Sequence, residues 1–280
     1  MPLTEQEIAF LKEKAWLIRR NTVKTMLWAG GGHAGGGLSQ TDILVALYYH
    51  YLKIDPKNPD WEDRDRVILS KGHGGIGFAP ILGDLGYFDE EMLKEFNHTG
   101  SPFGMHLDMR QVPGVDASTG SLGHGLPIAV GMALGARLKK KSWRVYCIIG
   151  DGECHEGSIW EAAMSAAHYK VDNLTAFIDR NKHCIDGPTE NIMSLEPLKE
   201  KWISFGWHAL EIDGHDFAEI GNAIEEALQT SGRPTVIIAH TIKGKGVDYM
   251  EDDPAWHYGG IDSDGLEKAL ESIDRMYGKA

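Results

Sequence analysis

The sequence feature that most constrains the fold is a strand–helix–strand pattern between residues 146 and 178. Residues 146–149 form a short apolar run, Tyr-Cys-Ile-Ile, and turn residues follow it directly. A helical stretch from about 159 to 169 carries four alanines, and a second apolar run, Leu-Thr-Ala-Phe-Ile, occupies residues 174–178. Two buried strands joined by a helix within about thirty residues form a parallel crossover unit. This unit predicts an α/β fold.

The same pattern returns further along the chain. Residues 207–212 are strand-like, residues 217–228 form an amphipathic helical pattern, and residues 235–239 are a third apolar run. Earlier, residues 67–69 predict a strand that leads into a glycine turn. We therefore expect a mostly parallel sheet with helices on both faces. Ligands of such sheets bind beyond the carboxyl ends of the strands, so the loops there are the places to look for chemistry.

Composition narrows the class of protein. The 280 residues contain 28 Lys and Arg against 41 Asp and Glu, a net charge of −13, which argues against nucleic acid and acidic membranes as partners. No apolar run approaches the ~18 residues of a membrane span. The three cysteines form no disulfide pattern, which suits a reducing compartment, and we expect a cytoplasmic protein.

The chain shows no internal repeat and no Pro/Ser-rich linker, so we expect a single domain over residues 1–280. Thr4 and Glu7 form the pattern of a capping box at the start of an N-terminal helix, residues 4–20. Residues 251–280 are expected to form a C-terminal tail that ends in a helix after Gly265.

Two glycine-rich stretches each contain a histidine. Residues 30–37 place six glycines around His33, which indicates either a loop that lets backbone approach a ligand or a flexible loop. Residues 72–77 match GxGxxG, a weak sign of a nicotinamide site. His73 fills the first variable position of that motif, and Asp89, about twenty residues on, resembles a helix N-cap instead of the acidic end of a strand. A nicotinamide dehydrogenase is therefore a remote alternative.

The most specific stretch follows the first strand of the crossover unit. Gly150-Asp151-Gly152 comes directly after that strand, and Asn181 follows the next one. Carboxylate and amide oxygens are ligands for Mg²⁺ or Ca²⁺, which commonly bridge a protein to a diphosphate. The alternative for Asp151 is a simple Asx turn, and zinc is disfavoured by the spacing of the cysteines and histidines.

These motifs occur in one order in a known family. From about Trp28 to His257 the chain resembles the N-terminal region of transketolase, an enzyme that uses thiamine diphosphate. The resemblance implies the thiamine diphosphate-binding (PP-type) fold, with thiamine diphosphate and Mg²⁺ or Ca²⁺ as cofactors. It also implies roles for individual residues. Those expected to meet the substrate or the reactive end of the cofactor are His33, His73, His106 and His257.

The same resemblance implies a cofactor-binding set and a metal-binding set. Metal ligands would be Asp151, Asn181 and the backbone carbonyl of His183. The residues that match cofactor contacts are His33, His73, Gly120, Ser121, Leu122, Gly152, Glu156, Asn181 and Lys243. His106 departs from the family pattern because it stands in Gly-Met-His-Leu where the family usually has Gly-His-Pro. The family also commonly has Gln at the position of His124.

The resemblance further implies transfer of a two-carbon ketol unit from a ketose phosphate to an aldose phosphate. Family members carry a second domain that supplies an activating glutamate, and this sequence ends at Ala280 without one. We therefore expect the N-terminal subunit of a split transketolase, active with a separate C-terminal subunit in a hetero-tetramer built on a dimer. Alternatives are a subunit of a 1-deoxyxylulose-5-phosphate synthase-like or dihydroxyacetone synthase-like enzyme, or a non-catalytic cofactor-binding module.

Overall fold

The predicted strands join in one five-stranded sheet in the computed structural model, which describes residues 2–279. The strand order is β1-β2-β3-β7-β6, and all four neighbouring pairs are parallel. The strands of this sheet are β1 (Arg66–Leu69), β2 (Val145–Gly150), β3 (Leu174–Arg180), β6 (His208–Asp213) and β7 (Thr235–His240). A separate antiparallel pair consists of β4 (His183–Cys184) and β5 (Gly187–Pro188). The prediction of a mostly parallel sheet is confirmed.

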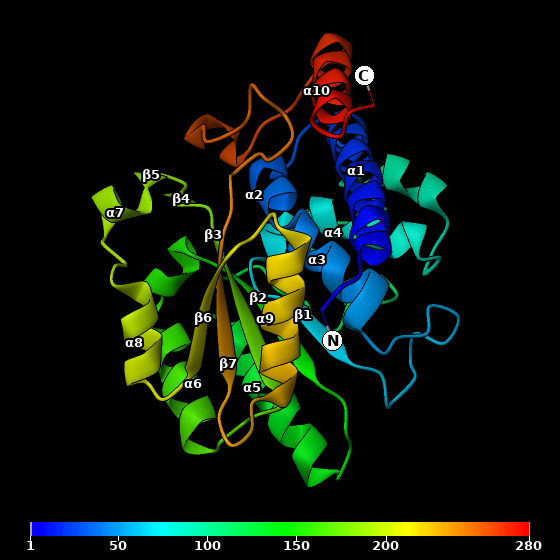
Figure 1. The fold of residues 1–280 in the computed structure, drawn as a ribbon. Coiled ribbons are helices and arrows are strands. Elements are labelled where there is room, and N and C mark those ends of the chain that lie inside the picture. Colours follow the sequence, from blue (N-terminus) through cyan, green and yellow to red (C-terminus); the bar gives the residue numbers. More distant parts are fainter. Residues whose placement is uncertain (1, 280) are drawn as a thin grey trace.

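Helices surround this sheet on both faces (Figure 1). They are α1 (Glu5–Trp28), α2 (Ala34–Ser39), α3 (Thr41–Ala46), α4 (Gly75–Asp84), α5 (Gly125–Leu138), α6 (Gly157–His168), α7 (Thr189–Ile192), α8 (Leu198–Ser204), α9 (Phe217–Gln229) and α10 (Ser263–Met276). Short 3-10 turns occupy Gly72–Gly74, Glu90–Glu95, Gly152–His155 and Pro254–His257, and a π turn occupies Leu47–Tyr51. Within residues 2–279, no helix has the length and apolar character needed to cross a bilayer.

Alternation along the strands divides the core into two clusters. Ile148 and Phe177 face a core built with α1–α4, α9 and α10, whereas Ile149 and Ile178 face a core built with α5, α6 and α8. A parallel sheet buried on both faces needs apolar residues at nearly every strand position, which is what the runs on β2 and β3 provide. The predicted arrangement of helices on both faces is therefore confirmed.

The N-terminal helix is longer than predicted. The capping box of Thr4 and Glu7 forms as expected, but α1 continues past residue 20 to Trp28. Its last turns bury polar side chains, and the hydroxyls of Thr22 and Thr25 bond back to backbone carbonyls four residues earlier. Val23 and Met26 are buried there too, but the polar residues among them weaken the apolar periodicity on which the predicted helix end rested.

The glycine stretch at residues 30–37 is not a flexible loop. Residues from Ala34 onward form the buried helix α2, and His33 lies at its N-cap. The glycines allow α2 to approach α4 closely, since a Cβ on Gly77 would lie 2.5 Å from the carbonyl oxygen of Gly37. Such glycine-permitted packing holds the backbone that presents His33 in a fixed position.

The carboxyl ends of the strands bring the suspected loops together. Strands β1, β2, β3 and β7 run in parallel, so the segments that follow them leave the sheet at one edge. Along the chain, β1, β2 and β3 are added side by side in one direction. The chain then crosses to β6 at the far edge, and β7 comes back to fill the place between β6 and β3. This change of direction between β3 and β7 is a topological switch point, where α/β sheets commonly bind ligands.

Candidate functional site

A cleft of about 410 Å³ opens at this edge of the sheet. All the predicted site residues line it except Ser121, which is exposed on the surface beside it. The predicted residues that line the cleft are His33, His73, His106, Gly120, Leu122, Asp151, Gly152, Glu156, Asn181, His183, Lys243 and His257. Residues separated by more than 200 positions in the sequence therefore share one site.

Three of the predicted histidines pack ring against ring at one end of the cleft. The ring centroids of His33 and His73 lie 5.0 Å apart, and His257 lies 5.2 Å from His33 and 5.3 Å from His73. Tyr258 closes the group, with its ring 4.9 Å from that of His33. We call His33, His73 and His257 the histidine cluster.

The histidine cluster is electrically neutral. Burial, together with His106 and Lys243, lowers the pKa of His33 to about 4. Burial, together with Lys71, lowers the pKa of His73 to about 2, while burial and Lys243 lower that of His257 to about 4. Near pH 7 each ring therefore offers one N–H donor and one lone pair, which suits contacts with hydroxyl and carbonyl groups.

Lys243 fixes the tautomer of one ring in the cluster. Its Nζ lies 3.0 Å from His257 Nδ1. An ammonium only donates, so Nδ1 of His257 accepts and Nε2 carries the ring proton. Burial, with Lys71 nearby, lowers the pKa of Lys243 to about 8, so the ammonium form still predominates near neutral pH. By contrast, Nδ1 of His33 is buried and has no hydrogen-bond partner among residues 2–279.

Another part of the cleft is charged and centred on Asp151. Oδ1 of Asp151 accepts from the backbone N–H of Gly152 at 2.7 Å, and Oδ2 accepts from the N–H of Lys182 at 2.6 Å. Arg180 donates to the same Oδ2 at 3.0 Å. Burial raises the pKa of Asp151, and nearby Asp179 adds to that effect, while Arg180 opposes it. These contacts hold the carboxylate in a fixed orientation.

Asn181 is oriented by a buried ion pair that the sequence did not reveal. Its Nδ2 donates to Asp179 Oδ2 at 3.2 Å, and its Oδ1 accepts from the N–H of His183 at 3.2 Å. Asp179 also pairs with Lys71 and accepts from the hydroxyl groups of Ser39 and Thr241. Burial alone would raise the pKa of Asp179, but the Lys71 ammonium and these donors hold it below the usual range.

The oxygen atoms around Asp151 are of the kinds that a divalent cation takes as ligands. Asp151 and Asn181 contribute a carboxylate and an amide carbonyl. The ligand predicted from His183 is its backbone carbonyl, and its side chain instead contacts Asp252 through Nε2 at 2.7 Å. Within residues 2–279 no three His, Cys, Asp or Glu side chains converge as a metal centre. Mg²⁺ is often held by one or two carboxylates together with phosphate oxygens, so this donor set requires the diphosphate to complete it.

Sequence reasoning missed several buried charges around the predicted residues. Glu153, two positions after Asp151, accepts from the N–H groups of Gly123 and Gly150 and from the Ser70 hydroxyl. Its carboxylate therefore links the end of β2 to the residue after β1 and to the loop before α5. Lys71, Asp179 and Arg180 were missed as well. The available signal was a charged residue at or just after the carboxyl end of a mostly apolar strand, where a buried charge needs a partner.

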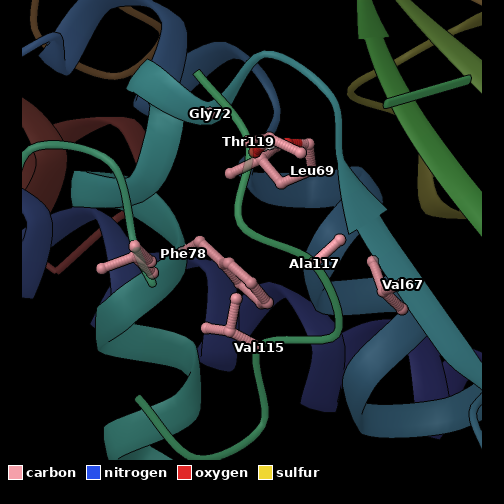
Figure 2. A pocket seen from close by; sticks show the side chains of 8 residues that line it. Val67, Leu69, Gly72, Phe78, Val115, Ala117 and Thr119 are labelled. Atoms are coloured by element: carbon pink, nitrogen blue, oxygen red, sulfur yellow. Dashed lines mark hydrogen bonds between the residues drawn. The ribbon is translucent and has the colours of Figure 1, made fainter. Parts of the chain in front are cut away.

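A second cavity lies beside Gly72, between β1, α4 and residues 115–119 (Figure 2). Its volume is only about 10 Å³, and apart from Thr119 its side chains are apolar. The Thr119 hydroxyl donates to the carbonyl oxygen of Leu69 at 2.6 Å. A space of roughly one water molecule cannot hold a metabolite, so the chemistry belongs to the larger cleft.

Comparisons with known proteins agree with this geometry. The family model described as transketolase, thiamine diphosphate binding domain, matches residues 12–274. A 6-deoxy-6-sulfo-D-fructose transketolase subunit from Clostridium sp. is 48% identical over 91% of this chain and 92% of its own length. An apulose-4-phosphate transketolase subunit from Actinobacillus succinogenes is 41% identical over 94% of this chain and 95% of its own.

A solved transketolase from Campylobacter jejuni superimposes with a TM-score of 0.87 at 31% identity, covering 99% of this chain. The chain spans 43% of that longer protein, whereas it matches nearly the full length of the two subunits above. The fold, the order of the motifs and these similarities lead to one conclusion: the chain belongs to the transketolase family and corresponds to its thiamine diphosphate-binding domain.

Proposed function

We propose that this chain is the N-terminal subunit of a two-polypeptide transketolase that moves a two-carbon ketol unit from a ketose phosphate to an aldose phosphate. The observation that carries the proposal is the sharing of one cleft by the Asp151–Asn181 pair and the histidine cluster. One end suits a metal–diphosphate group, and the other suits a polyhydroxylated substrate. The proposal places the chain in the carbohydrate metabolism of the cytoplasm, in the pentose phosphate pathway.

In this proposal Asp151, Asn181 and the backbone carbonyl of His183 hold Mg²⁺ or Ca²⁺, and Gly152 and Lys243 lie on the cofactor side. Thiamine diphosphate, when bound, supplies the electron sink for cleavage of a carbon–carbon bond. The neutral rings of His33 and His257 can exchange hydrogen bonds with substrate hydroxyl and carbonyl groups. His257 presents an Nε2–H donor, because Lys243 occupies its other nitrogen.

A separate C-terminal polypeptide would supply the pyrimidine-binding domain and the activating glutamate. Two relatives that match nearly the whole chain are named as subunits, which supports an arrangement of this kind. Glu156, at the N-cap of α6 and on the cleft wall, is the residue we place beside the interface with that polypeptide. The hetero-tetramer built on a dimer remains part of the proposal.

The test is reconstitution of the chain with the polypeptide that co-purifies with it. Calorimetric titration with thiamine diphosphate, with and without Mg²⁺, measures cofactor binding, and xylulose 5-phosphate with ribose 5-phosphate measures ketol transfer. We expect activity only in the two-chain complex. Full ketol transfer by the chain alone would contradict the split arrangement. Cofactor binding without activity in any complex would favour a non-catalytic module.

The names of the relatives suggest further donors for the same assay. The 48% identical relative is named for 6-deoxy-6-sulfo-D-fructose and the 41% identical relative for apulose 4-phosphate. Both compounds are therefore compared with xylulose 5-phosphate at equal concentration, and kcat/KM ranks them. Pyruvate with glyceraldehyde 3-phosphate serves as the control for a 1-deoxyxylulose-5-phosphate synthase-like reaction. Preference for pyruvate would replace ketol transfer with that alternative.

A further inference from the structure

The loop that carries Lys243 is anchored at two points from outside the cleft. This loop, residues 241–246, follows β7. The backbone N–H of Ile242 donates to Nε2 of His215 at 2.9 Å. At the other side of Lys243, the carbonyl oxygen of Lys245 accepts from Nε of Arg19 at 3.1 Å. Two side chains from distant parts of the sequence therefore hold the backbone on both sides of Lys243.

A single carboxylate joins these two anchors. Asp42 on α3 accepts from Arg19 through two hydrogen bonds, at 2.8 and 2.7 Å, and from Nδ1 of His215 at 2.7 Å. The side chain of Arg19 is fully buried and that of Asp42 is 3% exposed. The hydroxyl of Tyr277, just after α10, accepts from Arg19 at 2.7 Å. Segments from both ends of the chain thus meet behind the loop.

The hydrogen bonds require one tautomer of His215. Its Nε2 accepts from a backbone N–H and must lack a proton, so Nδ1 carries the proton and donates to Asp42. Burial would raise the pKa of Asp42, but the adjacent Arg19 outweighs it and lowers the pKa to about 2, so the carboxylate remains ionised. Asp42 therefore selects the ring form that can hold Ile242. This is the usual way in which a neighbouring acceptor fixes a histidine.

The loop is shaped to fit against Arg19. Gly246 has φ +99°, a left-handed conformation that favours glycine, and a Cβ there would lie 3.0 Å from Cδ of Arg19. Neither Asp42 nor His215 lines the cleft, and both lie on a separate groove with Tyr277. Their contacts with the site therefore run through the backbone of the loop.

We propose that Asp42 and His215 are positioning residues which, with Arg19, hold the 241–246 loop so that Lys243 faces His257 and the cofactor. The proposal rests on the proposed function, because it assigns the anchor to a cofactor-side lysine. It also makes a claim about the loop that does not depend on any reaction: the order of residues 241–246 depends on the His215 ring nitrogens.

The test uses His215→Phe, which keeps a ring of similar size and removes both nitrogens. The matched control is His240→Phe, at the end of β7, which removes an exposed contact with Glu211. We expect hydrogen exchange of the Ile242 amide to accelerate about tenfold in His215→Phe, since loss of one hydrogen bond is worth about that factor. The dissociation constant for thiamine diphosphate with Mg²⁺ should also rise about tenfold in the two-chain complex, with little change in the control.

A spectroscopic measurement separates positioning from general stability. In the wild-type chain the ¹⁵N shifts of His215 should show a protonated Nδ1 and an unprotonated Nε2. Asp42→Asn should convert this signal to a mixture of the two tautomers. If Asp42→Asn does not fold, the exchange and affinity measurements on His215→Phe still test the proposal. Unchanged exchange at Ile242, or faster exchange with unchanged cofactor affinity, would overturn the proposal. A wild-type complex that binds no thiamine diphosphate would instead overturn the proposed function.

Discussion

The two parts of the cleft differ in charge: the part around Asp151 contains buried ion pairs, whereas the histidine cluster consists of neutral rings. Around Asp151 the buried charges are paired: Arg180 contacts Asp151, and Lys71 pairs with Asp179. In the histidine cluster the rings are neutral and contact one another, and His257 also accepts from Lys243. Burying a charge requires compensation by a partner, whereas a buried neutral imidazole retains free hydrogen-bonding capacity. The comparison indicates that one end provides a rigid frame and the other keeps groups available for a ligand.

Arg180 shows how far the frame at the charged end extends. Besides Asp151, its guanidinium contacts Thr189, Glu190 and Glu196, so it also ties down the segment that follows β5. That segment forms one wall of the cleft through residues such as Ile192. The position of the predicted metal ligand and the shape of the entrance therefore depend on the same side chain.

The largest effect is expected from removing a member of the neutral cluster. His257→Asn keeps a polar side chain but loses the imidazole, and we expect kcat of the two-chain complex to fall by about 10²–10⁴-fold, the usual contribution of a positioned proton-transfer or hydrogen-bonding group. Cofactor affinity should change little. His155→Asn is the control, because His155 also lines the cleft but its Nε2 is hydrogen-bonded to the carbonyl oxygen of Met193. Equal activity of the two variants would contradict a substrate role for His257.

The next effect concerns the frame and is measured as stability. Asp179→Ala leaves the Lys71 ammonium buried without its carboxylate, and such a loss typically costs about 3–5 kcal/mol. For a domain of this size that corresponds to a fall of roughly 10 °C in Tm. Asp186→Ala, at an exposed position on the same cleft, should leave Tm nearly unchanged. Thermal unfolding followed by circular dichroism compares the two, and equal Tm values would show that the buried pair does not stabilise the fold.

Local patterns in the sequence predicted the sheet and the glycine-rich and Asp151–Asn181 parts of the cleft. Apolar runs of three to five residues predicted β1, β2, β3 and β7 to within two residues, and the motifs at residues 72–77, 150–152, 181 and 241–246 each follow one of these strands. The Lys71–Asp179 pair could not be predicted in this way. Its two members lie 108 positions apart, and only the pairing of β1, β2 and β3 brings them together.

The resemblance contributed what patterns could not. His257 and His33 are 224 positions apart, and no periodicity connects them, yet their rings are in contact. A glycine run disfavours helix locally, so residues 30–37 are consistent with a loop in the sequence, whereas close packing on α4 makes residues from Ala34 onward helical. Tertiary contacts of this kind are absent from any window of sequence.

A smaller effect is expected for the carboxylate that faces the cofactor. Asp151→Asn preserves the shape of the side chain but removes a charge and replaces one of two accepting oxygens with an NH₂ group. We therefore expect some loss of stability together with a fall of about 10–100-fold in affinity for the metal–diphosphate group. Calorimetry with thiamine diphosphate at several Mg²⁺ concentrations measures this change. Asp186→Asn again provides a control on the same cleft. An unchanged affinity would mean that Asp151 is structural only, the Asx-turn alternative.

The smallest effect is a change in how stability responds to pH. Burial lowers the pKa of His73 from an ordinary 6.5 to about 2, so between these values the unfolded chain binds a proton that the folded chain does not. Stability linked to His73 is therefore fully present above pH 6.5 and is lost progressively as the pH falls toward 2. Replacing the ring with an amide that does not titrate should remove this part of the response.

We therefore expect Tm of His73→Asn to fall less than that of the wild-type chain between pH 7 and pH 5, by about 2–4 °C. Each variant is compared with itself at the two pH values, so a constant loss of packing cancels from the comparison. His168→Asn, at an exposed position at the end of α6, should follow the wild-type curve. If the His73→Asn and wild-type curves run parallel, His73 becomes charged in the folded chain as readily as in the unfolded one. The neutral histidine end would then lose its contrast with the charged end, because burial would no longer be what keeps its rings unprotonated.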